Sequence, residues 1–128
     1  KLISKLGIDR VKLTGRVSED EKTWLYRHCD AFLFPSKAEG FGIPVIEAMQ
    51  QGCKVFSSKL TSLPEICGPH ATYWDNFDAA DMAKVVKEGL SKDDQHLANE
   101  RKEYAHRFNY DKYTAEYIQL YKNILCNK

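Results

Sequence analysis

The stretch PSKAEGFGIPVIEAM, at residues 35–49, decides the fold of this chain. An apolar run at Ala31–Phe34 leads into it and predicts a short buried strand. Two glycines flank Phe41, so the backbone can turn tightly there and approach a ligand closely. Proline is tolerated at the first position of a helix, and Pro44 is followed by residues 45–51, which continue as a predicted helix. The stretch therefore predicts a strand, a glycine loop and a helix.

The glycine loop carries the first candidate site. It aims backbone N–H groups and the positive end of a helix at one point, which suits a phosphate group. Glu39 and Glu47 bracket that point. Carboxylates fit such a site if they accept hydrogen bonds from sugar hydroxyls, as an acidic residue does for ribose in dinucleotide folds. The alternative interpretation makes Glu39 a solvated loop residue and lets Glu47 interact with the helix dipole.

The composition limits the class of protein. With 128 residues, 43% of them apolar and 29% charged, the chain has the size and make-up of one domain with a core. Its net charge of +1 gives no field that would select nucleic acid or an anionic membrane. The sequence has no run of about 18 apolar residues and no signal peptide. Because the four cysteines show no C-x-x-C spacing, we expect free thiols, no metal and a cytoplasmic location.

Caps, glycine stops and hydrophobic periodicity predict the remaining elements. Ser18 and Glu21 form a capping box that starts a helix, and Asp78 caps another. The expected strands are Val11–Thr14, Ala31–Phe34, Val55–Phe56 and Ala71–Trp74. The expected helices cover residues 1–7, the segment from Ser18 onward, and residues 44–51, 63–66, 78–89, 93–107 and 111–126.

Three of these helices predict how their side chains are placed. In the helix that starts at Ser18, we expect Trp24, Leu25 and His28 to be buried. The lysines and arginines of residues 93–107 are expected on a solvated face. The last helix carries an apolar stripe that predicts packing in the core or against another domain, formed by Tyr113, Tyr117, Leu120, Tyr121 and Ile124.

Strands that alternate with helices predict a doubly wound, parallel, Rossmann-like α/β sheet. Ligands in such folds bind beyond the carboxyl ends of the strands. Three loops are expected at that edge, namely the glycine loop after Phe34, the turn at Gly15–Val17 and the pair Ser57–Ser58. The candidate site therefore lies where this class of fold places its ligands.

Several motifs carry a resemblance to a known family. They are Gly15–Ser18, Asp30–Ser36, Glu39–Met49, Gly52 and Ser62–Ile66. In this order they resemble the second half of the C-terminal nucleotide-binding domain of retaining GT-B glycosyltransferases, the group 1 family. The resemblance is strongest over Val11–Pro69 and continues weakly through the C-terminal helices.

The resemblance implies a role for each matching residue. Glu39 would contact the donor sugar near the reacting carbon and act as the catalytic residue, and Glu47 would accept hydrogen bonds from the ribose hydroxyls. Arg16 and Val17 would lie against the nucleobase. Backbone groups of the loop would hold the sugar hydroxyls and the phosphate oxygens, with donor-binding positions at Gly40, Phe41, Gly42, Ile43, Pro44 and Val45. Such enzymes use no metal or other cofactor, and fixed dipoles and cations stabilise the leaving diphosphate.

The function that the resemblance implies is donor binding in a retaining transferase. The enzyme would transfer a sugar from a nucleotide-diphosphate sugar, such as GDP-mannose or a UDP-hexose, to a glycan or a lipid-linked acceptor. One alternative is a non-catalytic module that binds nucleotide sugars, and another is an interaction domain with an idle site. Any peripheral association with the inner face of the membrane would come from parts outside this sequence.

The sequence departs from the family pattern in two respects. Lys54 stands where the family has proline, for which we expect little functional consequence. The start at Lys1 without a methionine predicts a fragment, and the resemblance implies that residues 1–128 are one partial domain, without the acceptor domain, the diphosphate-binding cations and the first two strands of the sheet. We therefore expect weak donor binding without turnover. The missing strands would leave an open edge, which predicts either re-pairing of Val11–Thr14 or a homodimer.

Overall fold

The computed structural model describes residues 2–91 and 95–126. Its strands form one parallel sheet in the order β1-β2-β3, and their bounds are Phe32–Phe34, Val55–Ser58 and Ala71–Trp74. The register pairs Phe32 with Val55, and Val55 with Ala71. This arrangement confirms the expected parallel α/β sheet, with consecutive strands as neighbours.

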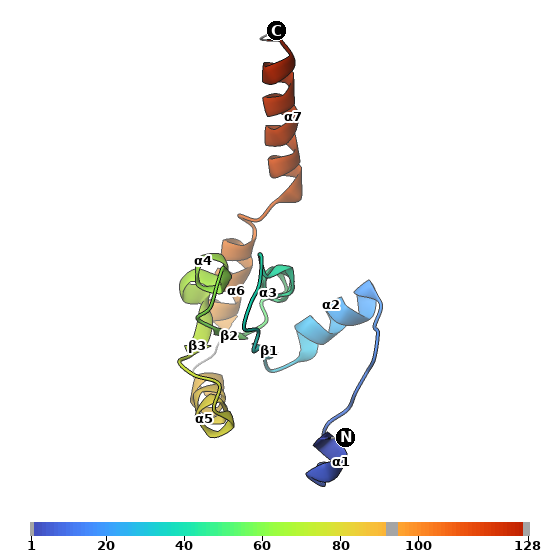
Figure 1. Ribbon diagram of the computed structural model, residues 1–128, viewed down its shortest axis with the longest axis vertical. Helices are drawn as coiled ribbons and strands as arrows, with labels where there is room; N and C mark the ends of the chain where they lie inside the picture. The colour runs from blue at the N-terminus through green and yellow to red at the C-terminus, as the bar shows by residue number, and fades with distance from the viewer. Residues whose placement is uncertain (1, 92–94, 127–128) are drawn as a thin grey trace.

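The helices follow the predicted order. Their bounds are α1 (Leu2–Lys5), α2 (Glu19–His28), α3 (Ile43–Gln50), α4 (Leu63–Cys67), the 3₁₀ helix η1 (Gly68–His70), α5 (Ala79–Leu90), α6 (Gln95–Ala105) and α7 (Tyr110–Cys126). The helix expected from Asp93 is described from Gln95, and Asp93 itself lies outside the described residues. Figure 1 shows α3, α4 and α6 gathered around the sheet, with α5 at the far end from α7.

Local capping chemistry explains where two helices begin. The Glu21 N–H donates to Ser18 Oγ at 3.2 Å, and the Ser18 N–H donates to Glu21 Oε2 at 2.8 Å, so the capping box is complete. At the start of α5, Asp78 Oδ1 accepts from the amides of Ala80 and Asp81. Both contacts satisfy helix amides that have no partner within the helix.

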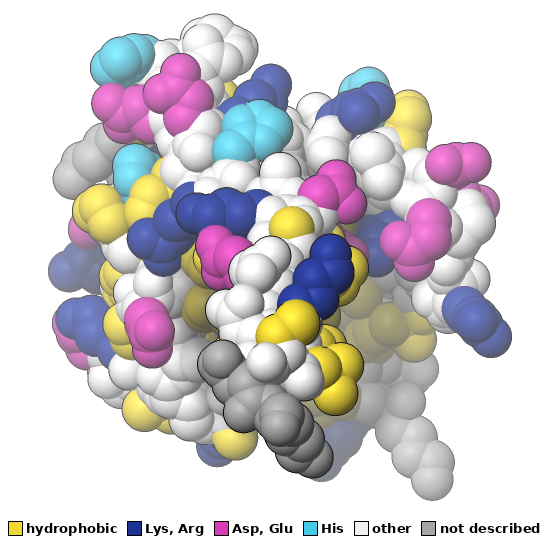
Figure 2. Space-filling view, turned by 90° about the horizontal axis from the view of Figure 1, so that it is seen from above, with side chains coloured by type: hydrophobic (Ala, Val, Ile, Leu, Met, Phe, Trp, Pro, Cys, Tyr) yellow, Lys and Arg dark blue, Asp and Glu magenta, His cyan; other side chains and the backbone are white. Residues whose placement is uncertain are grey.

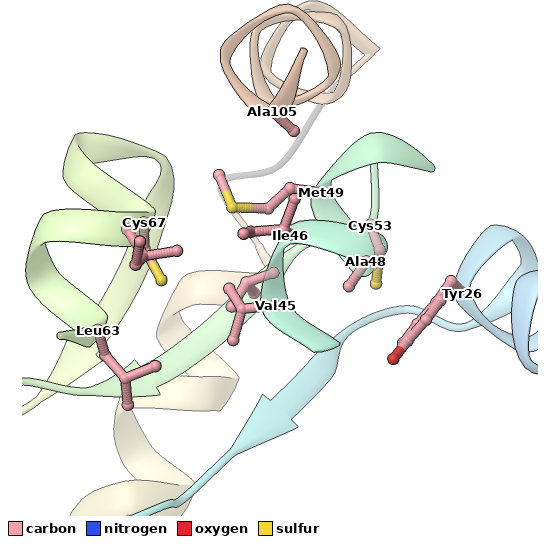
Figure 3. Packing of buried hydrophobic residues seen from close by; sticks show 11 residues of the cluster. Tyr26, Val45, Ile46, Ala48, Met49, Cys53, Leu63, Cys67 and Ala105 are labelled. Carbon is pink, nitrogen blue, oxygen red and sulfur yellow. The ribbon is translucent and has the colours of Figure 1, made fainter. Parts of the chain in front are cut away.

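The main core lies around α3. Its buried side chains meet α4, α6 and strand β2, and Tyr26 closes the cluster from α2. Figure 3 shows Val45, Ile46 and Met49 between Ala105 on one side and the α4 residues on the other. Successive strand residues point to opposite faces, so Val55 joins this core while its neighbour Phe56 lies against α5 at Gly89. Helices therefore cover both faces of the sheet.

The expected strand at Val11–Thr14 is wrong. The segment has no regular secondary structure, and Leu13 is 81% exposed. A strand exists only through hydrogen bonds to a neighbouring strand, and none of the described residues pairs with this segment. The same segment therefore leaves the outer edge of β1 open within the described chain.

Two predictions about side-chain burial are also wrong. The buried residue of α2 is Tyr26, whereas Trp24 and Leu25 are exposed and the His28 ring stacks on Trp24 at 4.2 Å. In α6, Arg101 is buried rather than solvated, and its Nε donates to the carbonyl of Gly52 at 3.1 Å. In both helices the buried face is the one that packs against another element, and the local sequence does not indicate which face that is.

Helix α7 extends away from the sheet (Figure 1) and has no buried residue. Its predicted stripe of tyrosines and aliphatic side chains is present and exposed; core packing of that stripe is therefore wrong. Packing against another domain stays a prediction. Among the described residues, no helix has the length and apolar character needed to cross a membrane.

The close contact between α5 and the sheet at Gly89 gives a test of this fold. A Cβ at Gly89 would stand 2.6 Å from Cε1 of Phe56, which is fully buried and has no room to move. A contact this short belongs at the upper end, about 2–3 kcal/mol, of the cost of overpacking, which outweighs the roughly 1 kcal/mol that alanine gains over glycine in a helix. We expect Gly89→Ala to lower the free energy of unfolding by about 1–2 kcal/mol in urea denaturation.

The matched control is Gly40→Ala. A Cβ there meets no atom within 4 Å, so we expect a change within about 0.5 kcal/mol. Equal stability of the two variants would show that Phe56 is not fixed against α5.

Candidate functional site

Gly42 shapes the candidate site. It is the N-cap of α3 and has a left-handed backbone with φ of 98°. A Cβ at this position would be strained by that φ and would stand 3.0 Å from the side chain of Leu63. The turn lets the Val45 N–H donate to the Gly42 carbonyl at 3.0 Å. Glycine is therefore required for the sharp entry into α3.

The structure narrows the set of amides that a ligand could use. Pro44 has no N–H, and the Val45 N–H already donates to Gly42. Within the described residues, the amides of Phe41, Gly42 and Ile43 have no hydrogen-bond acceptor. These three N–H groups stand at the positive end of α3, where an anion is favoured. Pro44 and Val45 therefore offer no free amide of their own in this structure, and their place in donor binding stays a prediction.

Glu39 is held in a fixed position. Ser36 Oγ donates to Glu39 Oε1 at 2.7 Å, and the Glu39 N–H donates to Thr61 Oγ1 at 3.1 Å. Ser62 Oγ lies 3.2 Å from the carbonyls of both Glu39 and Phe41, so its hydroxyl bridges the two ends of the loop. A half-buried carboxylate with these contacts is not a freely solvated loop residue.

Thr61 pays a conformational cost for its contact with Glu39. It has a positive φ of 53°, which a β-branched residue rarely adopts. Such a conformation costs of order 1–3 kcal/mol and persists only where the surroundings impose it. Here the hydroxyl oxygen of Thr61 accepts a hydrogen bond from the Glu39 N–H. The hydroxyl of the next residue, Ser62, donates to the carbonyl of Glu39. Local strain and loop positioning therefore occur together.

Glu47 forms an ion pair that the sequence did not predict. Lys22 Nζ lies 3.0 Å from Glu47 Oε1 and 2.7 Å from Glu19 Oε2. Its hydrogen bonds to Glu19 and then to Glu47 raise the pKa of Lys22 above its ordinary value. Lys22 joins α2 to α3 across 25 positions of sequence, and no local pattern indicates such a distant pairing.

Two of the expected site residues, Arg16 and Val17, lie in a cavity that neither Glu39 nor Glu47 lines. Arg16 and Val17 line a cavity of about 590 Å³ together with Trp24, and within the described chain no hydrogen bond or ion pair joins them to Glu39 or Glu47. The third expected loop is structural, because buried Ser58 donates its hydroxyl to the carbonyl of Ser36 at 2.7 Å.

The surface around this end of the molecule carries no field of one sign. Figure 2 looks onto the end from which α7 extends, and there basic side chains are interspersed with acidic ones. Hydrophobic side chains lie exposed between them. A larger polar cavity of about 760 Å³ lies near Gly52 and Lys54, at the edge where the strands begin. A ligand at the glycine loop would therefore meet a few placed groups rather than a long-range field of one sign.

The Lys22 ion pairs can be tested by titration. A pKa raised in the folded state adds stability that is complete below the unfolded pKa of about 10.4 and is lost as pH rises above it. We expect Glu19→Gln and Glu47→Gln each to lower the Lys22 pKa, with the larger effect from Glu19→Gln. NMR titration of the lysine side chains measures this, and the other lysine signals are the internal control. An unchanged Lys22 pKa in Glu47→Gln would contradict the pairing across α2 and α3.

Comparisons with known proteins place the chain among sugar transferases. The family model for glycosyl transferases group 1 matches residues 1–123. The chain is 37% identical over 93 residues to the serotype-specific mannosyltransferase WbdA of Escherichia coli, covering 71% of this chain and 11% of that protein. It is 32% identical over 114 residues to the O-antigen chain mannosyltransferase B of Escherichia coli, covering 88% of this chain and 30% of that protein.

A solved structure confirms the fold. Sucrose-phosphate synthase from Thermosynechococcus elongatus superposes with a TM-score of 0.87 at 24% sequence identity, covering 99% of this chain and 33% of that one. The chain thus spans about a third or less of the length of these proteins. The expected Rossmann-like fold of a GT-B glycosyltransferase is confirmed. With the family model matched over nearly its whole length, the chain belongs to the group 1 glycosyltransferase family.

Proposed function

We propose that this chain is the donor-binding part of a retaining glycosyltransferase that uses a nucleotide-diphosphate sugar. The observation that carries the proposal is the start of α3, where three amides without an acceptor in the described chain lie between Glu39 and Glu47. Amides at a helix start suit phosphate oxygens, and carboxylates suit hydroxyls. A sugar diphosphate carries both kinds of group, so it fits the site better than phosphate alone.

In this proposal each side of the loop has its own task. Glu39, oriented by Ser36, contacts the sugar near the reacting carbon. The amides of Phe41, Gly42 and Ile43 bind sugar hydroxyls and phosphate oxygens. Negative charge develops on the leaving diphosphate as the glycosidic bond breaks, and preorganised N–H dipoles stabilise that charge. The proposal requires no metal ion or other cofactor.

Glu47 and α2 would hold the nucleoside. Lys22 occupies Glu47 Oε1 and so orients the carboxylate, while the ribose hydroxyls bind its other oxygen or share the first. Arg16 and Val17 would lie against the base, in the cavity at the start of α2. Because Lys22 ties α2 to α3, the base and ribose positions are fixed relative to each other.

The names of the relatives support a sugar class. Both Escherichia coli proteins described above are named as mannosyltransferases. We propose a hexose donor, with GDP-mannose first and UDP-hexoses as the alternatives. A glycan or lipid-linked acceptor is proposed on the same ground, since one relative is named for the O-antigen chain.

The outer edge of β1 could pair with a strand from outside the described chain. Phe32 donates its N–H to Lys54 on the β2 side, so the N–H of Leu33 points to the open edge. Leu33 is also 49% exposed. We propose that preceding segments of a longer protein pair here, and that a second copy does so when residues 1–128 stand alone.

The catalytic role is tested in the full-length enzyme. Glu39→Ala removes the carboxylate at the reacting carbon, so we expect transfer from the nucleotide sugar to the acceptor to fall by at least about a hundredfold in kcat/KM. Glu65→Ala is the matched control, because only the main-chain carbonyl of Glu65 has a hydrogen-bond contact among the described residues. Near-normal turnover in Glu39→Ala would remove the proposed role.

The open edge is tested by light scattering on residues 1–128 at high concentration. We expect a dimeric mass for the wild type and a monomeric mass for Leu33→Pro, which removes the edge N–H while the β2 side stays paired. A monomeric wild type at all concentrations would refute the homodimer.

A further inference from the structure

The junction between α6 and α7 touches the glycine loop. The ring of Phe108 meets the ring of Phe41 edge to face, with centroids 5.9 Å apart and an interplanar angle of 87°. This edge-to-face geometry is a favourable one for aromatic pairs and stabilises the contact beyond the effect of the buried area. The contact joins the loop to a segment far away in the sequence.

Phe108 is itself held by Arg107. The guanidinium of Arg107 lies 4.0 Å from the ring centre of Tyr104 and 4.5 Å from that of Phe108. Its Nη2 donates to the carbonyl of Glu65 at 2.9 Å and lies 3.4 Å from that of Ile66. A planar guanidinium can stack on rings and donate at its edge at the same time, which an ammonium cannot do. Arg107 therefore ties the α6 end to α4.

The loop needs such an anchor. Gly40 and Gly42 give the backbone more freedom than other residues would, and that freedom must be removed for the amides to keep one position. Ser62 holds the carbonyl of Phe41, and Phe108 holds its side chain. Next to Phe41 lies an apolar cavity of about 210 Å³, bounded by Phe108 and Tyr110. Without the Phe108 ring, Phe41 could turn into that cavity and carry its amide with it.

We propose that Phe108 and Arg107 are positioning residues of the donor site, which set the amides of Phe41 to Ile43 through the Phe41 side chain. The inference rests on the proposed function for its ligand, a nucleotide-diphosphate sugar. The claim that Phe108 and Arg107 set the position of the loop does not depend on which ligand binds. Neither residue touches the ligand in this proposal. They act through Phe41, so their loss should weaken donor binding more than it weakens folding.

The test compares Phe108 variants of the 128-residue chain by NMR, with UDP-glucose and GDP-mannose as the probes. Phe108→Ala should shift or broaden the amide signals of Phe41, Gly42 and Ile43 and raise the donor Kd by at least about tenfold. Phe108→Tyr keeps the ring and should restore both. Phe108→Leu keeps apolar volume without a ring, and it replaces the alanine variant if that one does not fold.

Two further variants separate positioning from general packing. Tyr117→Ala, an exposed aromatic on α7 whose aromatic contact is with Tyr121, should leave the loop amides and the Kd unchanged. Arg107→Lys keeps the charge but loses the stacked fork, so it should weaken donor binding in the same direction as Arg107→Ala.

The outcomes are distinct. Unchanged loop amides and a Kd within about twofold of the wild type in both Phe108→Ala and Phe108→Leu would overturn the inference, as would a tyrosine variant as weak as the alanine one. If the 128-residue wild type binds neither nucleotide sugar, the Kd comparison is made in the full-length enzyme, and absence of binding there would remove the support for the proposed function. In that case the loop amides alone decide whether Phe108 positions Phe41.

Discussion

The burial of α3 against the sheet is the interaction on which the rest of the structure depends. Val45, Ala48 and Met49 have no exposed surface, and burying such apolar side chains contributes about 1.5–3 kcal/mol for each large one. Helices α2, α4 and α6 all contact α3, and strand β2 returns directly beneath it. Once α3 is fixed in this way, its N-terminal end stands beyond the carboxyl end of β1. The position of the candidate site is therefore a consequence of core packing.

Local chemistry explains which parts of the fold could be predicted from the sequence. The capping box at Ser18 spans three residues, and the strands β1 to β3 are short apolar runs, so each was predictable within its own window. Val11–Thr14 shows the limit of such patterns. Its alternation suits a strand, but a strand needs a neighbour, and none of the described residues provides one. The predicted burial of Trp24 in α2 is wrong for the same reason. Helix α3 packs against the face of α2 that carries Tyr26, and the face that carries Trp24 stays exposed.

The candidate site likewise combines residues that local sequence predicts with residues that it does not. Glu39, Glu47 and the glycine loop lie within one short stretch and follow from its residue types. Lys22 and Phe108, which contact that stretch, come from distant positions, and no spacing rule connects them to it. The positive φ of Thr61 was the least predictable feature, since a β-branched residue argues against it. Such exceptions are expected where function imposes a conformation that local preference would avoid.

The supports of the site share one property, which is that each stands on an element packed against α3. Lys22 reaches the site from α2, Ser62 from the start of α4, and Phe108 from the end of α6. The loop itself, with its two glycines, has little stiffness of its own. Its geometry is therefore set from outside, by contacts such as those of Ser62 and Phe108 with Phe41, whose relative positions the core determines. A substitution that moves α6 against α3, for example at fully buried Ala105, would displace Phe108 and alter the loop without touching a ligand. The stability of the domain and the geometry of the candidate site are thus coupled, because both depend on how α3 packs against the sheet.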